Sequence, residues 1–409
     1  MDNQIVCFCE LIKNIIHVDE ECCFQGEVNW SYLVQLAKEH NLLALFVEGA
    51  SKHYSFISRP EYEKEMNESI AIVSAQVRRT SAFLKLYEAF VEVDLHPIVM
   101  KGLICRELYG TLGDHRPSGD EDILIRPSEY ELAKRILIEN GYISEIEKET
   151  EAKIDRLQEV SFIHPKERLH IELHLNPMGR ETEERTRMSE YFVNVFEDYR
   201  EVNIQGILVR TMNHQEHLTF LILHAFKHFT MGGFGIRQML DILLYQQQFG
   251  SEIDFKQLDK TLFEFKAAVF WNDMIHIGNK YFGFKFSAMM EPNCPQELLE
   301  DMVQSGAFGN KSQAEITAGR ATMRASANYM KNKSSNMFNV VWKSIFPSKG
   351  YMLYQAPYLK KNPWLLPVAW FRRWGKFIKK NKGDNANLTV ESMKISQRRM
   401  KVLKKYDLV

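Results

Sequence analysis

Several features that would assign a chain to a specialised class are missing from this sequence. The first residues, MDNQIVCFCELIKNII, carry an early acid and lack both a cationic segment and a small-residue cleavage site, so they do not resemble a secretory signal. The longest apolar run, PWLLPVAWF from Pro363, is about half of a membrane-spanning length and contains two prolines. These absences predict a cytoplasmic protein, and peripheral association with a membrane is left open.

Cysteines are few, and the CxxC pairs that are typical of zinc sites are absent. Two close pairs of cysteines fall near the amino terminus, which favours reduced structural thiols and leaves a metal clip as the alternative. The cysteines are Cys7, Cys9, Cys22, Cys23, Cys105 and Cys294.

Acidic residues are absent between Glu315 and Asp384. Residues 316–409 hold 20 Lys and Arg against 3 Asp and Glu, whereas the rest of the chain holds 32 against 50. The basic segment 316–383 also carries several tryptophans, a composition that suits nucleic acid or a membrane surface. An amphipathic helix packed on the acidic part of the chain explains the same charge balance, and this is the preferred interpretation.

The overall composition is that of a globular protein: the 409 residues are 45% hydrophobic and 26% charged, enough for two or three domains. Apolar spacing predicts a helical module over residues 1–80. We expect an α+β core over residues 81–213, a helical domain over residues 214–335 and a basic, aromatic segment over residues 336–409.

Within the predicted core, helices and short strands alternate. HPIVMKG is expected to be a strand that ends in glycine, and DILI a second strand. The next helix should start at a capping box of Ser128 and Glu131 and stop at Asn140 and Gly141. EVSFIHPKERLHIELHLNP then predicts two strands around a turn at 165–167, and a further strand could follow near 207–211.

The strongest chemical signal is the pair Asp120 and Asp122 at the start of the DILI strand. Residues two apart on a strand face the same side, and two like charges so placed need a counter-ion. Mg²⁺ or Mn²⁺ is the simplest one. Glu172 lies between His170 and His174 on the polar face of a later strand and could supply a third carboxylate for in-line nucleotidyl displacement. A pair of exposed carboxylates near a turn is the alternative.

A phosphate-binding role is expected for the residues around this pair. Lys101 and Gly102 stand at a strand-to-helix junction where a backbone can approach phosphate, and Ser118 and Gly119 could add donors. Lys101 and Arg116 could neutralise phosphate charge. A surface charge or a structural salt bridge is the alternative for these two basic residues.

Four histidines fall near one face of the helix that begins at HQEHLTF. His224 and His228 have the i,i+4 spacing of a metal-binding pair, but without a third ligand we favour packing or hydrogen bonding to substrate. His174, on the polar face of the later strand, is a further candidate for contact with substrate. In the following helix, Arg237 and Asp241 have the spacing of a helical ion pair. The four histidines are His214, His217, His224 and His228.

The run PIVMKGLICRELYGTLGDHRPSGDEDILIRP resembles the uncharacterised bacterial nucleotidyltransferase family of the polymerase-beta-like superfamily, in which a KG motif, an Arg and a GDxD motif occur in this order. The resemblance continues through LHIELHLN and GIRQMLDILL. It implies a small mixed sheet with packed helices, flanked by mainly helical N- and C-terminal parts. It also implies transfer of a nucleoside monophosphate from an NTP, with ATP the first candidate, to an acceptor hydroxyl, with release of pyrophosphate.

Carried over by position, the resemblance makes Asp120 and Asp122 the metal-binding and catalytic pair, with Glu172 at the place of a third carboxylate. Two positions depart from the superfamily pattern: Leu103 stands where Ser or a second Gly is usual, and Glu121 stands where an apolar residue is usual. Glu121 therefore predicts a more exposed strand start. A non-catalytic nucleotide-binding or scaffold protein and a tRNA-modifying, toxin-like transferase are the alternatives. The acceptor and the oligomeric state are not specified by the sequence.

Overall fold

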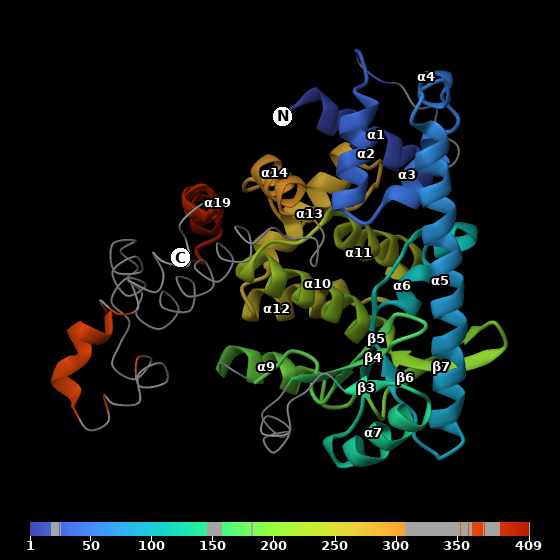
Figure 1. Ribbon diagram of the computed structural model, residues 1–409, viewed down its shortest axis with the longest axis vertical. Helices are drawn as coiled ribbons and strands as arrows, with labels where there is room; N and C mark the ends of the chain where they lie inside the picture. Colours follow the sequence, from blue (N-terminus) through green and yellow to red (C-terminus); the bar gives the residue numbers. More distant parts are fainter. Residues whose placement is uncertain are drawn as a thin grey trace. The chain divides into compact units, whose positions relative to one another are not determined.

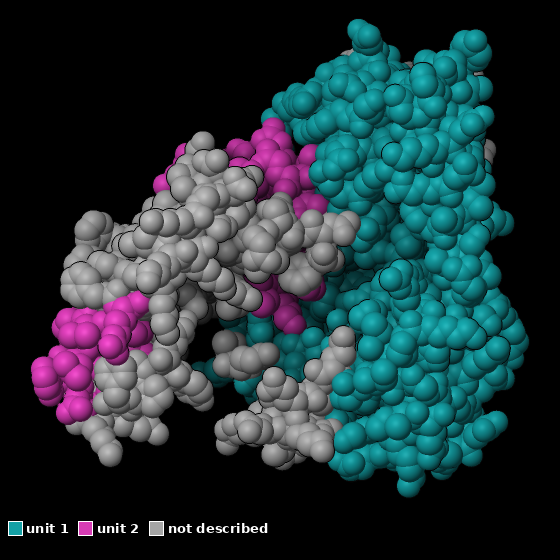
Figure 2. Space-filling model, in the orientation of Figure 1, with its two compact units in different colours: residues 1–226, 235–296 teal, residues 227–234, 297–409 magenta. Residues whose placement is uncertain are grey.

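The computed structural model describes most of the chain, and the helices and strands below belong to that part. Its residues fall into two compact units: the first contains residues 1–226 and 235–296, and the second contains residues 227–234 and 297–409 (Figure 2). The described residues are 1–17, 24, 26–144, 158–180, 183–306, 352, 359, 362–370, 372 and 385–408.

Helices make up the amino-terminal part of the first unit. Two of them, α1 and α2, begin at a side-chain cap: the Asn29 side chain accepts a hydrogen bond of 3.1 Å from the Tyr32 backbone N–H and starts α2. The last of these helices, α5, contacts α3 near one end and then passes the strands, as Figure 1 shows. This helix continues without interruption past residue 80, where the sequence predicted the helical module to end. The helices are α1 (Asn3–Ile16), α2 (Trp30–Glu39), α3 (Leu43–Ala50), α4 (Tyr54–Ile57) and α5 (Tyr62–Val91).

The first unit contains a five-stranded mixed sheet, with strand order β1-β2-β5-β4-β3. Only β2 and β5 are parallel neighbours within it, and the other pairs are antiparallel. The strands are β1 (Ile98–Val99), β2 (Asp120–Leu124), β3 (Ile143–Ser144), β4 (Glu159–His164) and β5 (Leu169–His174). The prediction of an α+β fold with a small mixed sheet is confirmed.

One face of this sheet is the hydrophobic core. Ile123 of β2, together with Ile171 and Leu173 of β5, is fully buried against Phe83 and Tyr87 of α5. The alternation predicted for β5 is therefore correct, because its apolar residues all point to this face. Burial of such side chains contributes about 1.5–3 kcal/mol each and fixes the strand register. The opposite face of β2 and β5 carries mostly polar residues, with Leu124 at the end of β2 as the apolar exception.

The helix after β2, α7 (Tyr130–Glu139), begins differently from the prediction. The capping box at Ser128 and Glu131 is wrong: a short 3₁₀ turn, η2 (Pro127–Glu129), precedes α7, and Glu129 Oε2 accepts from the Arg126 backbone N–H at 2.8 Å. The predicted stop is correct, since α7 ends before Asn140 and the next residue, Gly141, has φ +85°.

A separate hairpin of β6 (Tyr199–Ile204) and β7 (Ile207–Met212) follows the sheet, and mostly helices complete the described chain. No helix among the residues described is long and apolar enough to cross a membrane. Most of the basic segment 316–383 lies outside the described residues, as do Cys22 and Cys23. The remaining elements are α6 (Leu103–Glu107), η1 (Gly110–His115), α9 (Glu183–Tyr191), α10 (His214–Met231), α11 (Ile236–Phe249), η4 (Gly250–Glu252), α12 (Phe255–Glu264), α13 (Ala268–Tyr281), α14 (Pro295–Ser305), η6 (Pro363–Leu365) and α19 (Asn385–Lys405).

Candidate functional site

Parallel pairing of β2 with β5 brings the predicted carboxylates onto one face. In the register of the two strands, Asp120 stands opposite His170, and Asp122 stands opposite Glu172. Because alternate residues of a strand face opposite sides, both aspartates share the face that carries Glu172 and His174. This polar face is opposite the face that packs in the hydrophobic core, and it forms the candidate site.

Three side chains converge closely on this face. His174 Nε2 lies 3.2 Å from Asp122 Oδ1 and 3.6 Å from Glu172 Oε2. Ligand atoms of Asp122, Glu172 and His174 all lie within 4.8 Å of one another. Asp122 and His174 are buried, and Glu172 is half-buried. Two carboxylates and an imidazole at this separation are compatible with a metal site.

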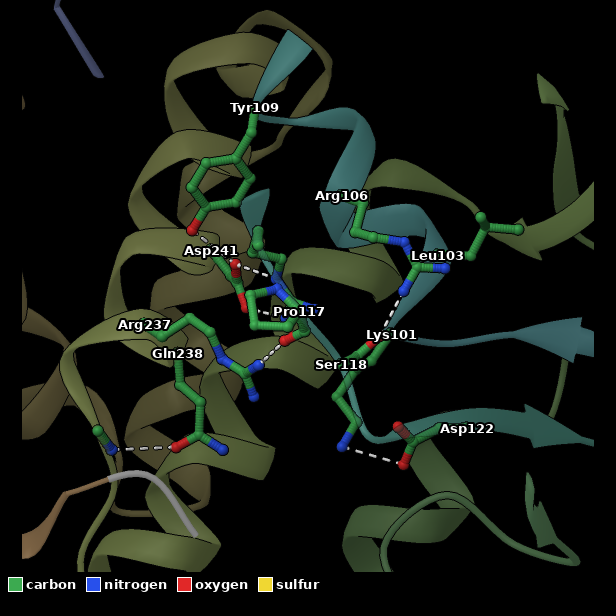
Figure 3. Close-up of polar contacts among 12 residues, drawn as sticks. Lys101, Leu103, Arg106, Tyr109, Pro117, Ser118, Asp122, Arg237, Gln238 and Asp241 are labelled. Carbon is green, nitrogen blue, oxygen red and sulfur yellow. Dashed lines mark hydrogen bonds and ion pairs between the residues drawn. The ribbon is translucent and has the colours of Figure 1, made fainter. Parts of the chain in front are cut away.

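Lys101 supplies the positive charge beside these carboxylates. Its Nζ lies 3.0 Å from Asp122 Oδ1 and 3.4 Å from His224 Nε2 on α10. Burial by itself would lower the pKa of Lys101, but the carboxylates of Asp122, Asp120 and Glu172 hold that pKa above its ordinary value. Lys101 therefore stays an ammonium group, and Figure 3 shows it turned toward Asp122.

The charges of the converging groups depend on each other. Burial favours the neutral form of Asp122, yet Lys101 and His174 hold the pKa of Asp122 well below its usual range. Burial also opposes the charged form of His174, but hydrogen bonds with Asp122 and Glu172 raise its pKa to about 9. Burial raises the pKa of Glu172. Asp122 therefore stays ionised, and its two neighbours, Lys101 and His174, are cationic.

Glu121 supports the site from the core side of β2. It is only 1% exposed, so the prediction of an exposed strand start is wrong. Its carboxylate pairs with Arg106 at 2.7 Å and accepts from the Leu103 backbone N–H at 2.7 Å. The carboxylate lies directly against Gly102, where a Cβ would come within 2.0 Å of Glu121 Oε2. Gly102 has φ +53°, so the turn that carries Lys101 requires glycine on both counts.

The loop before Asp120 is held by buried side chains. Arg116, a predicted nucleotide-binding residue, forms two hydrogen bonds with Asp241 of α11 at 3.0 and 2.5 Å. Asp241 also accepts from the Tyr109 hydroxyl at 2.9 Å. The predicted ion pair of Arg237 with Asp241 is wrong, because Arg237 instead donates to the Pro117 carbonyl (Figure 3).

Ser118 and Gly119, also predicted to bind nucleotide, differ in their surroundings. Ser118 is buried: its backbone N–H donates to Gln76 Oε1 at 2.9 Å, and its hydroxyl donates to Glu121 at 3.2 Å. A side chain at Gly119 would meet no atom within 4 Å. Gly119 is therefore the residue of this loop whose backbone borders open space.

The histidines of α10 have separate partners. His217 Nε2 lies 2.7 Å from the Met100 carbonyl oxygen, and His214 Nδ1 lies 3.0 Å from the Tyr245 hydroxyl. His224 faces Lys101, whereas His228 belongs to the second compact unit. In the described chain, none of them joins a group of three possible metal ligands. The fold therefore uses His217 in packing, as favoured for these histidines.

A polar sheet face with paired carboxylates, next to a lysine on a glycine turn, defines a candidate site for metal-assisted phosphoryl chemistry. Comparison with protein families gives the more specific assignment. Residues 26–283 match the family described as "Uncharacterised nucleotidyltransferase", so the chain belongs to this family. No curated protein and no solved structure matched the chain.

Sequence reasoning found the residues of the polar face but missed several of their supports. Alternation along β5 indicated Glu172 and His174, and both lie beside Asp122. The buried role of Glu121 and the pairing of Arg116 with Asp241 had no local signal, because each depends on contacts between distant elements. The available hint for Glu121 was its alternation with Asp120 and Asp122, which places it on the same face of β2 as the apolar Ile123.

Proposed function

We propose that this chain is a metal-dependent nucleotidyltransferase that moves a nucleoside monophosphate from an NTP to an acceptor hydroxyl and releases pyrophosphate. One observation carries the proposal: Asp122 and Glu172 are neighbours on parallel strands and, with His174, bring ligand atoms within 4.8 Å. Family membership supports the reaction class and an NTP as substrate. ATP is the first nucleotide to test.

The donor set fits a hard divalent cation. Carboxylate oxygens are the ligands that Mg²⁺ and Mn²⁺ prefer, and Asp120, on the same face, adds to those of Asp122 and Glu172. His174 contacts Asp122 at 3.2 Å and would orient this carboxylate as an outer partner. When bound, the cation would neutralise triphosphate charge and polarise the α-phosphoryl group. We assign Asp120, Asp122 and Glu172 to hold Mg²⁺ or Mn²⁺.

In the proposed reaction, the acceptor oxygen attacks the α-phosphorus, and the bond between that phosphorus and the bridging oxygen breaks. Pyrophosphate leaves with the electron pair, and the acceptor proton passes to Glu172 or to water. Lys101 would stabilise the negative charge that builds on the phosphates. Gly119 would let a phosphate approach the backbone, while Arg116 and Ser118 would hold the loop in place.

The test is label transfer from each NTP carrying ³²P at the α-phosphate, with Mg²⁺ and with small-molecule, protein and RNA fractions offered as acceptors. The intact chain should label one acceptor class. The double variant Asp120→Ala, Asp122→Ala should not label it, and the control Arg187→Gln, an exposed pair with Glu264, should. If no fraction is labelled above the level of the double variant, the transferase proposal is refuted.

A second candidate is a protein that binds NTP without turnover. The observation that favours it is that Asp122 Oδ1 already contacts two cationic groups, Lys101 at 3.0 Å and His174 at 3.2 Å. Such a protein would bind NTP in the presence of Mg²⁺ but label no acceptor. Equilibrium binding of NTP alongside the transfer assay separates the two candidates.

A further inference from the structure

Four arginines gather at the loop of residues 116–119, which leads into the metal-binding strand. Arg116 belongs to the loop, and the other three donate to Pro117 or Ser118. Two of them are neutralised by carboxylates: Arg106 by Glu121 at 2.7 Å, and Arg116 by Asp241 at 2.5 Å. Arg79 and Arg237 form no salt bridge with any described carboxylate. The positive charges of Arg79 and Arg237 are therefore not neutralised by a direct ion pair in the described chain.

Arg237 is the more constrained of these two arginines. It is half-buried near the start of α11, where one guanidinium nitrogen donates to the Pro117 carbonyl. Its Nε is buried and has no hydrogen-bond partner among the described residues. A buried donor without a partner destabilises the chain, and a ligand oxygen that accepts from it would remove that cost.

The electrostatic surroundings of Arg237 also favour an anion. Burial lowers the pKa of Arg237, the positive charge of Arg116 lowers it further, and the charges of Asp241 and Asp120 only partly offset these effects. The influence of Asp120 is informative, because it means that Arg237 lies within electrostatic reach of the carboxylate face. A phosphate group would compensate the cation directly.

The position of Arg237 relative to the metal-binding face identifies which phosphates it could reach. Figure 3 shows Arg237 extending from α11 to the Pro117–Ser118 stretch, with Lys101 and Asp122 on the other side of that stretch. Gly119, which follows Ser118, borders open space. An NTP whose α-phosphate lies at Asp122 could therefore extend past Gly119, with its terminal phosphates toward α11.

We infer that Arg237 is a binding residue for the β- and γ-phosphates of the nucleotide, and for the pyrophosphate that leaves. The inference rests on the proposed function and adds a recognition element from α11, outside the sheet. A guanidinium binds phosphate through two parallel N–H donors, which an ammonium group does not reproduce. Arg237 is a ligand contact and need not act on the reacting bond.

The experiment measures binding of Mn²⁺-pyrophosphate, of each NTP and of each nucleoside monophosphate by calorimetry. Pyrophosphate is the key probe, because it needs no knowledge of the preferred base. Arg237→Gln should weaken pyrophosphate and NTP binding by about 10- to 100-fold, the range expected for a charged hydrogen bond, and leave monophosphate binding within about 2-fold. The affinity of Arg237→Lys for pyrophosphate should fall between that of the parent chain and that of Arg237→Gln.

Two controls separate binding from folding. Arg187→Gln makes the same change on exposed α9 and should bind pyrophosphate like the parent chain. Because Arg237 also holds the Pro117 carbonyl, thermal unfolding is measured for each variant, and Arg237→Lys keeps the charge if Arg237→Gln does not fold.

The outcomes distinguish this inference from the proposed function. If the parent chain binds NTP and folded Arg237→Gln binds NTP and pyrophosphate equally well, the role of Arg237 is refuted and the proposed function stands. If NTP and monophosphate binding fall together, Arg237 does not discriminate the terminal phosphates and the inference is overturned. If the parent chain binds neither NTP nor pyrophosphate with Mn²⁺, the proposed function fails as well.

Discussion

At the scale of single residues, Gly102 makes the sharpest structural demand. Its φ of +53° lies in the left-handed region, and a Cβ would overlap the buried Glu121 carboxylate at 2.0 Å. Gly102→Ala should therefore lower the free energy of unfolding by about 2–4 kcal/mol, combining backbone strain with displacement of a buried ion pair. Chemical denaturation at neutral pH measures this change.

Gly119 is the matched control for this prediction. It lies in the loop just before Asp120, and a Cβ there would contact no atom within 4 Å. Gly119→Ala should change stability by less than about 0.5 kcal/mol. Equal losses for the two variants would show that the Glu121 contact does not set the requirement for glycine at 102.

Residue-scale prediction from sequence succeeded where one strand contained the whole pattern. Alternation in β5 was enough to separate Glu172 and His174 from their apolar neighbours Ile171 and Leu173. The sequence left a structural salt bridge open for Arg116 but could not name the partner, because Asp241 is 125 residues away in the sequence. Charged pairs of this kind depend on which elements pack together, and no local spacing encodes that packing.

At the scale of elements, His217 joins α10 to the strand that leads to Lys101. Its ring lies 2.7 Å from the Met100 carbonyl oxygen, and burial lowers its pKa to about 3, helped by the charge of Arg200. The unfolded chain binds the proton first, at a pKa near 6.5. Stability from the neutral ring is therefore complete above about pH 6.5 and declines as the pH falls toward 3, by up to about 1.4 kcal/mol per pH unit.

His217→Gln removes this titration, so its unfolding free energy should fall less steeply than that of the parent chain between about pH 6 and pH 4. Urea unfolding at several pH values measures both slopes. The same substitution at His96, which pairs with Asp94 in a connecting turn, serves as the control. Parallel slopes for the parent chain and His217→Gln would contradict a buried neutral ring.

Element prediction was most reliable where burial was one-sided. Strands β2, β4 and β5 were predicted because apolar residues gather on one face, and the structure confirms them. Strand β6 was missed, since its residues are mostly half-buried or exposed and give no apolar stripe. Its signal was the turn at Gln205 and Gly206, where both residues have positive φ, a conformation common in tight hairpins.

At the scale of the whole molecule, the second compact unit contains a buried arginine that links separate parts of its chain. Arg399 of α19 bonds to Asp301 of α14 and to the Phe229 carbonyl oxygen, and both charged side chains are at most 2% exposed. Arg399→Ala leaves the Asp301 carboxylate buried without this counter-ion, which should cost about 3–5 kcal/mol. Hydrogen exchange should then rise throughout α19.

The control for this variant is Lys401→Ala, an exposed position on the same helix that should leave exchange unchanged. Unchanged exchange in α19 of Arg399→Ala would show that other contacts anchor this helix. Sequence alone could not indicate this cluster. The preferred interpretation of the basic composition, a helix packed on the acidic part of the chain, specifies no residue pair, and the partner of Arg399 lies 98 residues earlier.

The central claim is that Asp122 and Glu172 form a divalent-metal site for a nucleotide. Electron paramagnetic resonance of Mn²⁺, titrated with and without ATP, tests it most directly, with Asp122→Asn, Glu172→Gln and the surface control Glu197→Gln compared with the parent chain. We expect the parent chain and Glu197→Gln to bind Mn²⁺ more tightly when ATP is present, and both site variants to lose at least about 10-fold in affinity. Equal Mn²⁺ binding by all four proteins would contradict the claim.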